Sequence, residues 1–427
     1  MFWKAINFEG EDIMKNVKYL ECVNCGKHYA PEKGRYTCDV CGPSLGILDV
    51  IYDYEYIKTK VSKESLKNNK NYDMWRYEPF MAVEEDGPKG KLRVGWSPLY
   101  KADGLAKEIG LDTLYVKDDG INPTSSLKDR ASAIAVAKAL EEKAEVICCS
   151  STGNAASSTA GNAASVGIKS VIFVPGRAPQ GKVAQLKIFG ANVMSVQGSY
   201  EETFKLSAEA IEKYGWYNRN AAVNPYCVEG KKTVSIETCE QMNWEVPDWI
   251  VFSVGDGCTI AGAYKGYVDL YEAGFIDKLP RVAGIQAEGC APLAHAWMEK
   301  REWKPEEENT LADSIAVGVP RNAVKALRAV EKSNGVWETV TDEEIMDAMR
   351  FMGKHAGVFG EPAGSAGMAG LRKLVAKGVI KKHETVVCAV TGNGLKDVVH
   401  AIEAAGEPIK VEPTSEGLAK ALKEIGY

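Results

Sequence analysis

Four segments of the chain place polar or glycine-rich residues directly after a run of strand-forming residues. They cover residues 118–130, 150–154, 255–259 and 391–397. In open α/β sheets, ligands collect at the carboxyl ends of the strands. We therefore expect the ligand-binding residues of this chain to lie in these four segments.

Lys128 has the most distinctive chemistry in the first segment. A turn at 122–124 precedes it, Ser125 or Ser126 is a suitable N-cap, and Lys128 then falls in the opening turn of an Ala-rich helix. The positive end of a helix disfavours an ammonium group and favours the neutral amine, which is the form that attacks an aldehyde. This segment alone leaves open a solvated, inert surface lysine.

The segment Gly255-Asp256-Gly257-Cys258-Thr259 has the pattern of an anion-binding turn between a strand and a helix. Backbone N–H groups converge at such a helix start, where a phosphate fits. The segment is not a Walker loop, because it lacks Gly-Lys-Ser/Thr, and it lacks the third glycine of a dinucleotide fingerprint. A plain tight turn is the alternative.

The other two segments offer neutral donors. Ser151, Thr152, Gly153 and Asn154 follow an apolar run and supply hydroxyls and backbone donors that suit a substrate carboxylate, although the same residues also suit a helix N-cap. Thr391 ends an apolar strand and presents a hydroxyl, which would give a ring nitrogen a neutral partner. A structural turn is the alternative there.

Residues 18–52 contain two CxxC pairs separated by a short polar stretch. The pairs are Cys22 with Cys25 and Cys38 with Cys41. Tetrahedral zinc takes four thiolates, and each CxxC turn presents two sulfur atoms to one side of the ion. The spacing predicts a zinc ribbon. Two thiol pairs without metal are the alternative, and His28 is a further possible ligand.

From about residue 96, strand patterns alternate with Ala-rich helical patterns, which predicts an α/β fold with a mainly parallel sheet. Residues 53–95 are charged and irregular, and they are expected to form a connector that wraps around the body. Residues 411–427 carry Leu418, Leu422 and Ile425 on one helical face. We expect this segment to be a helix that docks on the body.

The composition supports a globular enzyme rather than a polymer-binding protein. The 427 residues are 45% apolar, and the formal net charge of −6 comes from acidic and basic residues that are interspersed. Neither a nucleic-acid partner nor a membrane span is indicated. We expect a small-molecule substrate. Because the chain is long, has no signal segment and carries eleven cysteines, of which only four form CxxC pairs, we also expect a cytoplasmic location.

Taken together, these motifs resemble the threonine synthases, which are pyridoxal 5′-phosphate (PLP) enzymes of the tryptophan-synthase β fold. Members typically carry Asn-Pro-Thr-Gly-Ser-Phe-Lys-Asp-Arg around the lysine that forms a Schiff base with PLP, and residues 122–130 match seven of these nine. The resemblance covers nearly the whole chain. It includes the zinc ribbon of some members, Ser-Thr-Gly-Asn, Gly181-Lys182 with Gln185, Glu229-Gly230-Lys231-Lys232-Thr233, Glu361-Pro362-Ala363 and Thr-Gly-Asn-Gly-Leu-Lys-Asp.

The resemblance implies a fold and a division into domains. The expected fold has two open, mainly parallel sheets of PLP fold type II and a small N-terminal zinc ribbon. The expected domains are a ribbon at 18–52, a connector at 53–95, a large PLP-binding domain at 96–140 and 221–410, a smaller domain at 141–220, and a C-terminal helix at 411–427. Family members are commonly homodimers.

The resemblance also implies roles for individual residues. Lys128 would hold PLP and shuttle protons, Asn154 would bond the ring hydroxyl, and Thr391 would meet the pyridine nitrogen. The turn at 255–259 would bind the cofactor phosphate. The substrate, a small amino acid, would meet residues 151–154. Lys182 and Cys227 are further candidates at the substrate.

The chain departs from the family where the phosphate of O-phosphohomoserine would bind. The family usually has Asn-Ser-Val/Ile-Asn-Pro-x-Arg before Glu-Gly, and this chain has Ala221, Ala222 and Cys227 in place of the Asn, Ser and Arg. Lys182, Arg177 or Lys231 would have to compensate. Ser125 in place of Gly and Leu127 in place of Phe also alter the surroundings of Lys128. The polar ligands of the substrate phosphate are therefore missing from their usual positions.

Three functions follow from these observations. The first is a lyase of amino-acid biosynthesis that converts O-phosphohomoserine and water to threonine and phosphate. The second is a sibling enzyme of amino-acid metabolism, such as one that performs β-replacement on phosphoserine, threonine or serine deamination, or thiolytic cleavage of 2-amino-4-oxopentanoate. The third is a binding protein without catalysis, which the intact Lys128 disfavours.

Overall fold

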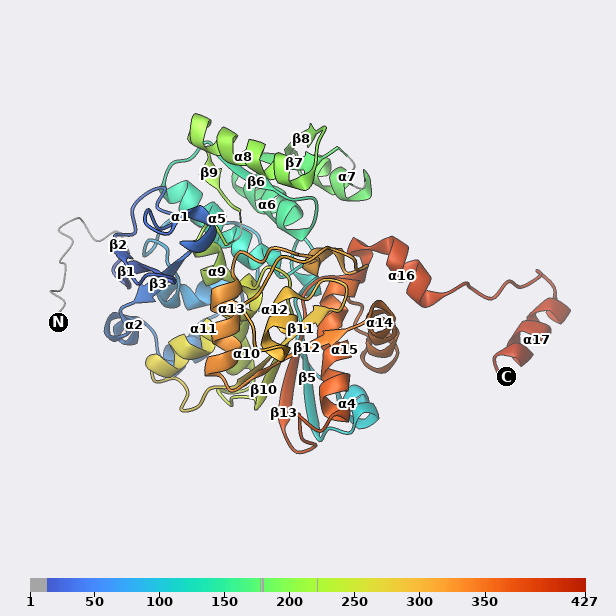
Figure 1. Ribbon diagram of the computed structural model, residues 1–427. Coiled ribbons are helices and arrows are strands. Elements are labelled where there is room, and N and C mark those ends of the chain that lie inside the picture. Colours follow the sequence, from blue (N-terminus) through green and yellow to red (C-terminus); the bar gives the residue numbers. More distant parts are fainter. Residues whose placement is uncertain (1–13, 177, 179, 221) are drawn as a thin grey trace.

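The computed structural model describes residues 14–176, 178, 180–220 and 222–427, whose strands form three sheets (Figure 1). The largest sheet is mainly parallel, with only its edge strand β4 antiparallel to β5. In spatial order its strands are β12 (Val336–Val340), β11 (Arg281–Ala287), β10 (Trp249–Ser253), β13 (Thr385–Val390), β5 (Thr113–Asp118) and β4 (Leu99–Lys101).

Both faces of this sheet are buried because the central strand β10 carries apolar residues at each position from Trp249 to Phe252. In β10, Ile250 and Phe252 point into one core, while Trp249 and Val251 point into the other. Continuous apolar runs of this kind are typical of parallel strands that are covered by helices on both sides. Successive side chains of β10 therefore pack against helices on opposite faces, and the sheet lies between two helical layers.

Helices from distant parts of the chain cover this sheet. One layer consists of α4 (Asp103–Ile109), α14 (Asp342–Ala356) and α15 (Pro362–Ala376), and the other includes α10 (Thr233–Gln241), α11 (Cys258–Glu272) and α13 (Ala323–Lys332). The remaining helical elements of this part are η2 (Asp119–Ile121), α9 (Tyr226–Lys231), α12 (Pro292–Met298), η3 (Asp313–Ile315), η4 (Gly394–Lys396) and α16 (Val398–Ala405).

A second sheet has four parallel strands. Their order is β8 (Asn192–Val196), β7 (Lys169–Pro175), β6 (Val146–Ser150) and β9 (Tyr217–Asn218). Its helices are α5 (Lys128–Glu141), α6 (Asn154–Val166), α7 (Gln180–Ile188) and α8 (Tyr200–Tyr214). The prediction of an α/β fold with two mainly parallel sheets is confirmed. The boundaries of the domains remain our proposal.

The N-terminal part forms a three-stranded antiparallel sheet in the order β2 (His28–Tyr29), β1 (Val17–Cys22) and β3 (Leu48–Tyr52), with the short helix α1 (Gly42–Leu45). Two lysines of the large-sheet helices hold β3. Lys325 Nζ donates to the carbonyl of Leu48 at 2.9 Å, and Lys265 Nζ donates to the carbonyl of Val50 at 2.8 Å. The small sheet is thus fixed to the body.

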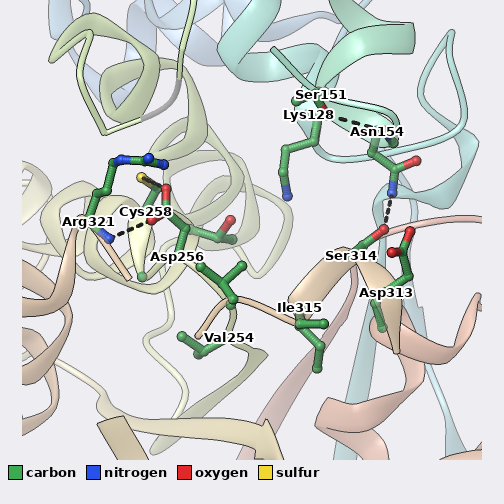
Figure 2. Close-up of a pocket in the computed structure, with 18 of the residues that line it drawn as sticks. Lys128, Ser151, Asn154, Val254, Asp256, Cys258, Asp313, Ser314, Ile315 and Arg321 are labelled. Atoms are coloured by element: carbon green, nitrogen blue, oxygen red, sulfur yellow. Dashed lines mark hydrogen bonds between the residues drawn. The ribbon is translucent and has the colours of Figure 1, made fainter. Parts of the chain in front are cut away.

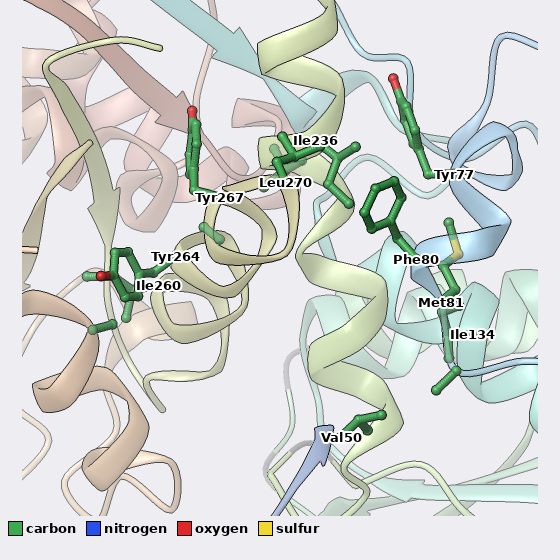
Figure 3. Packing of buried hydrophobic residues seen from close by; sticks show 14 of the residues in the cluster. Val50, Tyr77, Phe80, Met81, Ile134, Ile236, Ile260, Tyr264, Tyr267 and Leu270 are labelled. Atoms are coloured by element: carbon green, nitrogen blue, oxygen red, sulfur yellow. The ribbon is translucent and has the colours of Figure 1, made fainter. Parts of the chain in front are cut away.

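The connector is more ordered than the sequence predicted. It forms α2 (Tyr54–Lys60), α3 (Lys63–Asn68) and η1 (Met74–Phe80). Figure 3 shows Tyr77, Phe80 and Met81 beside Ile236 of α10 and Ile134 of α5, in one apolar cluster. The buried aromatic residues of this segment therefore pack against the body.

The C-terminal segment forms the predicted helix, α17 (Ser415–Glu424), which begins after the N-cap Thr414. The expectation that α17 docks on the body is wrong. The helix projects away from the body (Figure 1), and the side chains of Leu418, Leu422 and Ile425 are exposed. The amphipathic pattern of residues 415–424 predicts a helix, but it does not predict which surface, if any, packs against the apolar face of that helix. Among the described residues, no helix is both long and apolar enough to cross a membrane.

Candidate active site

A cavity of about 600 Å³ lies at the carboxyl ends of β6 and β10. All four chemistry-bearing segments contribute to its wall, which includes Lys128, residues 150–154, residues 255–259 and Thr391. In Figure 2 the side chain of Lys128 extends into the space between Asn154 on one side and Asp256 on the other. The segments that the sequence singled out therefore meet at one place.

Backbone hydrogen bonds hold the Lys128 loop against the end of β13. Leu127 N donates to the carbonyl of Thr391 at 2.9 Å, and Asn393 N donates to the carbonyl of Ser125 at 3.1 Å. Helix α5 begins at Lys128, as predicted, but the prediction of a serine N-cap is wrong. Leu127 is the N-cap residue, and Ser125 has a left-handed φ of 68°. This conformation accounts for the glycine that the family usually has there.

Lys128 sits where its amine is easily deprotonated. Burial, together with the positive charges of Lys231 and Arg219, lowers the pKa of Lys128 to about 8, while the charge of Glu361 acts in the opposite direction. An amine with such a pKa is partly neutral near physiological pH, and the neutral form is the nucleophile.

A buried ion network anchors the first turn of α5. Arg130 Nε donates to Asp119 Oδ2 at 2.7 Å, and Arg130 Nη2 donates to Glu237 Oε1 at 2.5 Å. Lys117 Nζ also pairs with Glu237 at 2.6 Å. Because Arg130 and Glu237 are fully buried, loss of one partner would leave an uncompensated charge in the core. The network therefore fixes where α5 starts.

The turn before α11 has the features of an anion site. Gly257 is the N-cap with a φ of 85°, and no side chain caps the helix, so the first N–H groups of this 15-residue helix are available to a ligand. A Cβ at Gly255 would lie 2.9 Å from Ile315 Cα. Asp256 accepts a hydrogen bond from Arg321 N at 2.8 Å, which fixes the turn from outside.

Asn154 begins α6 and reaches across the cavity to α15. Its Nδ2 atom donates to Glu361 Oε1 at 2.6 Å and to Ser314 Oγ at 3.4 Å. Burial raises the pKa of Glu361 to about 7, although the Asn154 hydrogen bond and the charge of Lys128 act in the opposite direction. Thr391 and Ser151 to Gly153 line the same wall.

Two further candidates lie near the cavity without lining it. Lys182 Nζ forms an ion pair with Asp313, which is a lining residue, so the lysine is engaged at the cavity mouth. Cys227 is fully buried, its Sγ lies 3.7 Å from the carbonyl of Arg219, and burial raises the pKa of its thiol. Ala222 is also buried. Ala221 and Arg177 lie outside the described residues.

Sequence reasoning missed three polar residues of the cavity wall. Glu361 belongs to a recognised motif, but its contact with Asn154 joins residues 207 positions apart. Lys231 was considered only as a compensating cation. Arg219 stands in no recognised motif, and its position is evident only from the packing of β9 against β6.

The four ribbon cysteines form one cluster. Their Sγ atoms lie within 4.8 Å of one another, and the Sγ atoms of Cys25 and Cys38 are 3.7 Å apart. Zinc–sulfur bonds of about 2.3 Å in a tetrahedron require about 3.8 Å between sulfur atoms. The cluster, which also contains Cys22 and Cys41, is consistent with a structural zinc ion.

Neighbouring donors support this cluster. Tyr29 Oη donates to Cys38 Sγ at 3.0 Å, and Asn24 Nδ2 donates to Cys41 Sγ at 3.4 Å. Such bonds orient thiolate ligands. His28 is hydrogen-bonded to Glu21 at 3.1 Å and does not belong to the cluster.

The lining residues fit PLP in their chemistry. The chain supplies an amine at Lys128 that lines the cavity, uncapped backbone donors at the start of α11 for a phosphate, a hydroxyl at Thr391 for the ring nitrogen, and an amide at Asn154. Residues 91–392 match the family of pyridoxal-phosphate dependent enzymes. The chain is therefore a PLP-dependent enzyme.

Similar proteins of known name show to which family of PLP-dependent enzymes the chain belongs. The chain is 40% identical to the threonine synthase of Methanocaldococcus jannaschii over 409 residues, which cover 95% of this chain and 99% of the relative. It is also 40% identical to the threonine synthase of Methanosarcina acetivorans over 407 residues, which cover 95% and 98%. The chain belongs to the threonine synthase family.

Solved structures agree in fold. A processed threonine deaminase isoform 2 from Solanum lycopersicum matches with a TM-score of 0.60 and 20% identity, over 78% of this chain and 88% of that chain. A fungal L-serine ammonia-lyase from Rhizomucor miehei matches with a TM-score of 0.62 and 18% identity, over 72% and 97%. At such identities the likeness shows the fold alone.

Proposed function

We propose that this enzyme converts O-phosphohomoserine and water to threonine and phosphate. The observation that carries the proposal is that Lys128, the turn at 255–259 and Thr391 line one cavity in a chain that aligns with threonine synthases over 95% of its length. The threonine synthase relatives supply the name of the reaction. The cavity chemistry supplies the groups that such a reaction needs.

Lys128 carries out the proton transfers in this proposal. When bound, PLP supplies an electron sink for the carbon atom that loses a proton. With a pKa of about 8, Lys128 Nζ accepts a proton as the free amine and returns it as the ammonium ion at similar pH. The charges of Lys231 and Arg219 favour its neutral form.

Other residues bind and orient the reactants. Ser151, Thr152 and Gly153 offer hydroxyl and backbone donors to the substrate carboxylate beside the positive end of α6. Asn154 would hold the ring oxygen of the cofactor, and the hydrogen bonds that its Nδ2 atom donates to Glu361 and Ser314 orient its amide.

The test is a product assay on the purified, cofactor-loaded protein. O-phosphohomoserine should yield threonine and phosphate in equal amounts. Parallel reactions with threonine, phosphoserine and 2-amino-4-oxopentanoate distinguish the sibling activities. If O-phosphohomoserine yields neither product while one of the other amino acids reacts, the proposed substrate is wrong and the sibling activity replaces it.

We also propose that the protein acts as a homodimer in the cytoplasm, as family members commonly do. The chain mass is 46.4 kDa. Light scattering after gel filtration should give twice this mass, and a single-chain mass across the tested concentration range would contradict the dimer.

A further inference from the structure

Two cationic side chains of the cavity wall form no ion pair among the described residues, although Asp256 of the same wall lies close enough to Lys231 for their charges to interact. Arg219, just after β9, is fully buried, and Lys231, at the end of α9, is 2% exposed. Neither forms an ion pair with a carboxylate of the described chain. The other fully buried cations differ, because Arg130, Lys117 and Lys232 are each paired with Asp or Glu. A buried charge without a counter-ion is costly, so these two cations indicate an anionic ligand.

Arg219 is held in place by a neutral partner. Its Nε and Nη2 atoms donate to Ser132 Oγ at 3.1 and 3.0 Å. Ser132 lies one helical turn after Lys128 on the same face of α5. This arrangement fixes the guanidinium on the Lys128 side of the cavity and leaves its Nη1 hydrogens for a ligand.

Lys231 is the last residue of α9, which packs against α11. A Cβ at Gly262 would lie 3.3 Å from Lys231 Cβ, so α9 packs closely against α11 at this point. Both Lys231 and Arg219 lower the pKa of Lys128 through their charge. Lys231 and Arg219 also line the same cavity as Lys128.

Neutral donors extend the same wall. Asn220 Oδ1 accepts a hydrogen bond from Ser150 N at 2.9 Å, while Asn220 Nδ2 and Ser150 Oγ are buried without partners in the described chain. Both residues line the cavity. Unsatisfied buried donors of this kind are expected where a ligand completes the hydrogen bonding.

We propose that Arg219 and Lys231, with Asn220 beside them, form a second anion subsite that binds the phosphate group of the amino-acid substrate. The start of α11 already provides donors for the cofactor phosphate, and two cations match the charge of a phosphate monoester, which approaches −2 at neutral pH. The identity of the substrate rests on the proposed function. The subsite itself rests on the two unpaired cations.

This subsite would replace the polar side chains that the family usually has at positions 222 and 227, where this chain has Ala222 and Cys227. Cys227 is buried behind the wall, where its Sγ lies beside the carbonyl of Arg219. In this subsite, Arg219, eight residues before Cys227, supplies the positive charge that the family's arginine would supply at position 227. Lys182 is not the replacement, because Asp313 already pairs with it.

The test measures binding of inorganic phosphate to the cofactor-loaded protein by calorimetry. Arg219→Met and Lys231→Met keep much of the side-chain volume and remove the charge. Each should weaken phosphate binding roughly 10- to 150-fold, the equivalent of one charged hydrogen bond. Cofactor content should be unchanged. Arg328→Gln, on the exposed surface of α13, removes a charge elsewhere and should leave phosphate binding unchanged.

Two outcomes would decide against the proposal. If the variants lose the cofactor yet bind phosphate as tightly as the wild type, the cations serve the cofactor. If wild-type protein binds no phosphate, the subsite does not exist. Arg219→Lys keeps a charge and should retain intermediate binding, which separates a lost charge from a misfolded protein. Because phosphate binding needs no turnover, a failure to convert O-phosphohomoserine would refute the proposed function without refuting the subsite.

Discussion

Asn154 Nδ2 donates a 2.6 Å hydrogen bond to Glu361 Oε1, which joins the start of α6 beside the four-stranded sheet to the start of α15 beside the six-stranded sheet. The bond fixes the one amide that is expected to meet the ring of the cofactor. It also gives the buried carboxyl group of Glu361 its only hydrogen bond among the described residues.

The first prediction concerns this contact. Glu361→Ala should lower cofactor affinity roughly tenfold or more, because Asn154 loses a charge-assisted hydrogen bond of about 1.5–3 kcal/mol and becomes free to rotate. Glu361→Gln keeps an acceptor and should lose much less affinity. The measurement is a cofactor titration. Equal affinities of Glu361→Ala and the wild type would show that Asn154 needs no such support.

The second prediction concerns the titration of Lys128. Its pKa is lowered from 10.5 to about 8, so in cofactor-free protein the amine should be mostly charged below pH 8 and mostly neutral above it. The rate of acetylation of Lys128, followed by peptide mass spectrometry, should therefore rise to half of its maximum near pH 8. Lys231→Met should shift this midpoint upward because it removes a repelling charge, and Glu361→Gln should shift it downward. A midpoint near 10.5 would contradict the environment described for Lys128.

The third prediction concerns the turn before α11. Gly257→Ala should lower stability by about 1–3 kcal/mol and weaken cofactor binding, because the residue has a φ of 85° and its new Cβ would lie 2.9 Å from Ala326 Cβ. Gly353→Ala is the matched control in α14, where nothing lies within 4 Å of an added Cβ. It should stabilise by about 0.5–1 kcal/mol. Thermal unfolding with and without PLP measures both effects.

The fourth prediction concerns the ribbon. Elemental analysis should find a single zinc ion per chain, and the double variant Cys22→Ser, Cys25→Ser should lose the ion and unfold at a lower temperature. Cys388→Ala, which changes a buried cysteine of β13, should keep full zinc content. Retention of zinc by the double variant would contradict the assignment of the four ligands.

Much of the fold and part of the site could be predicted from local sequence. The strands β5, β6, β10 and β13 are apolar runs that end in distinctive turns, so both the strands and their carboxyl ends were evident. Lys128 was placed correctly at the start of its helix for the same reason. These features depend on residues that are neighbours in the chain.

The features that the sequence did not predict depend on distant contacts or on unusual backbone conformations. Ser125 is a common N-cap residue, yet the turn holds it at a φ of 68° and prevents that role. Helix α17 has an apolar face, but nothing in its own residues specifies what covers it. Arg219 reaches the cavity wall through the pairing of β9 with β6, and Ser132, 87 positions away, holds its guanidinium, so no local motif marks it.

The most direct test of the central claim is to locate the cofactor on the chain. Purified protein loaded with PLP should show the visible absorption band of the lysine-bound cofactor. Reduction with borohydride followed by peptide mass spectrometry should then find the pyridoxyl group on Lys128, and Lys128→Ala should lack both the band and the label. A label on another lysine, such as Lys231, or the absence of any band in the wild-type protein, would contradict the account.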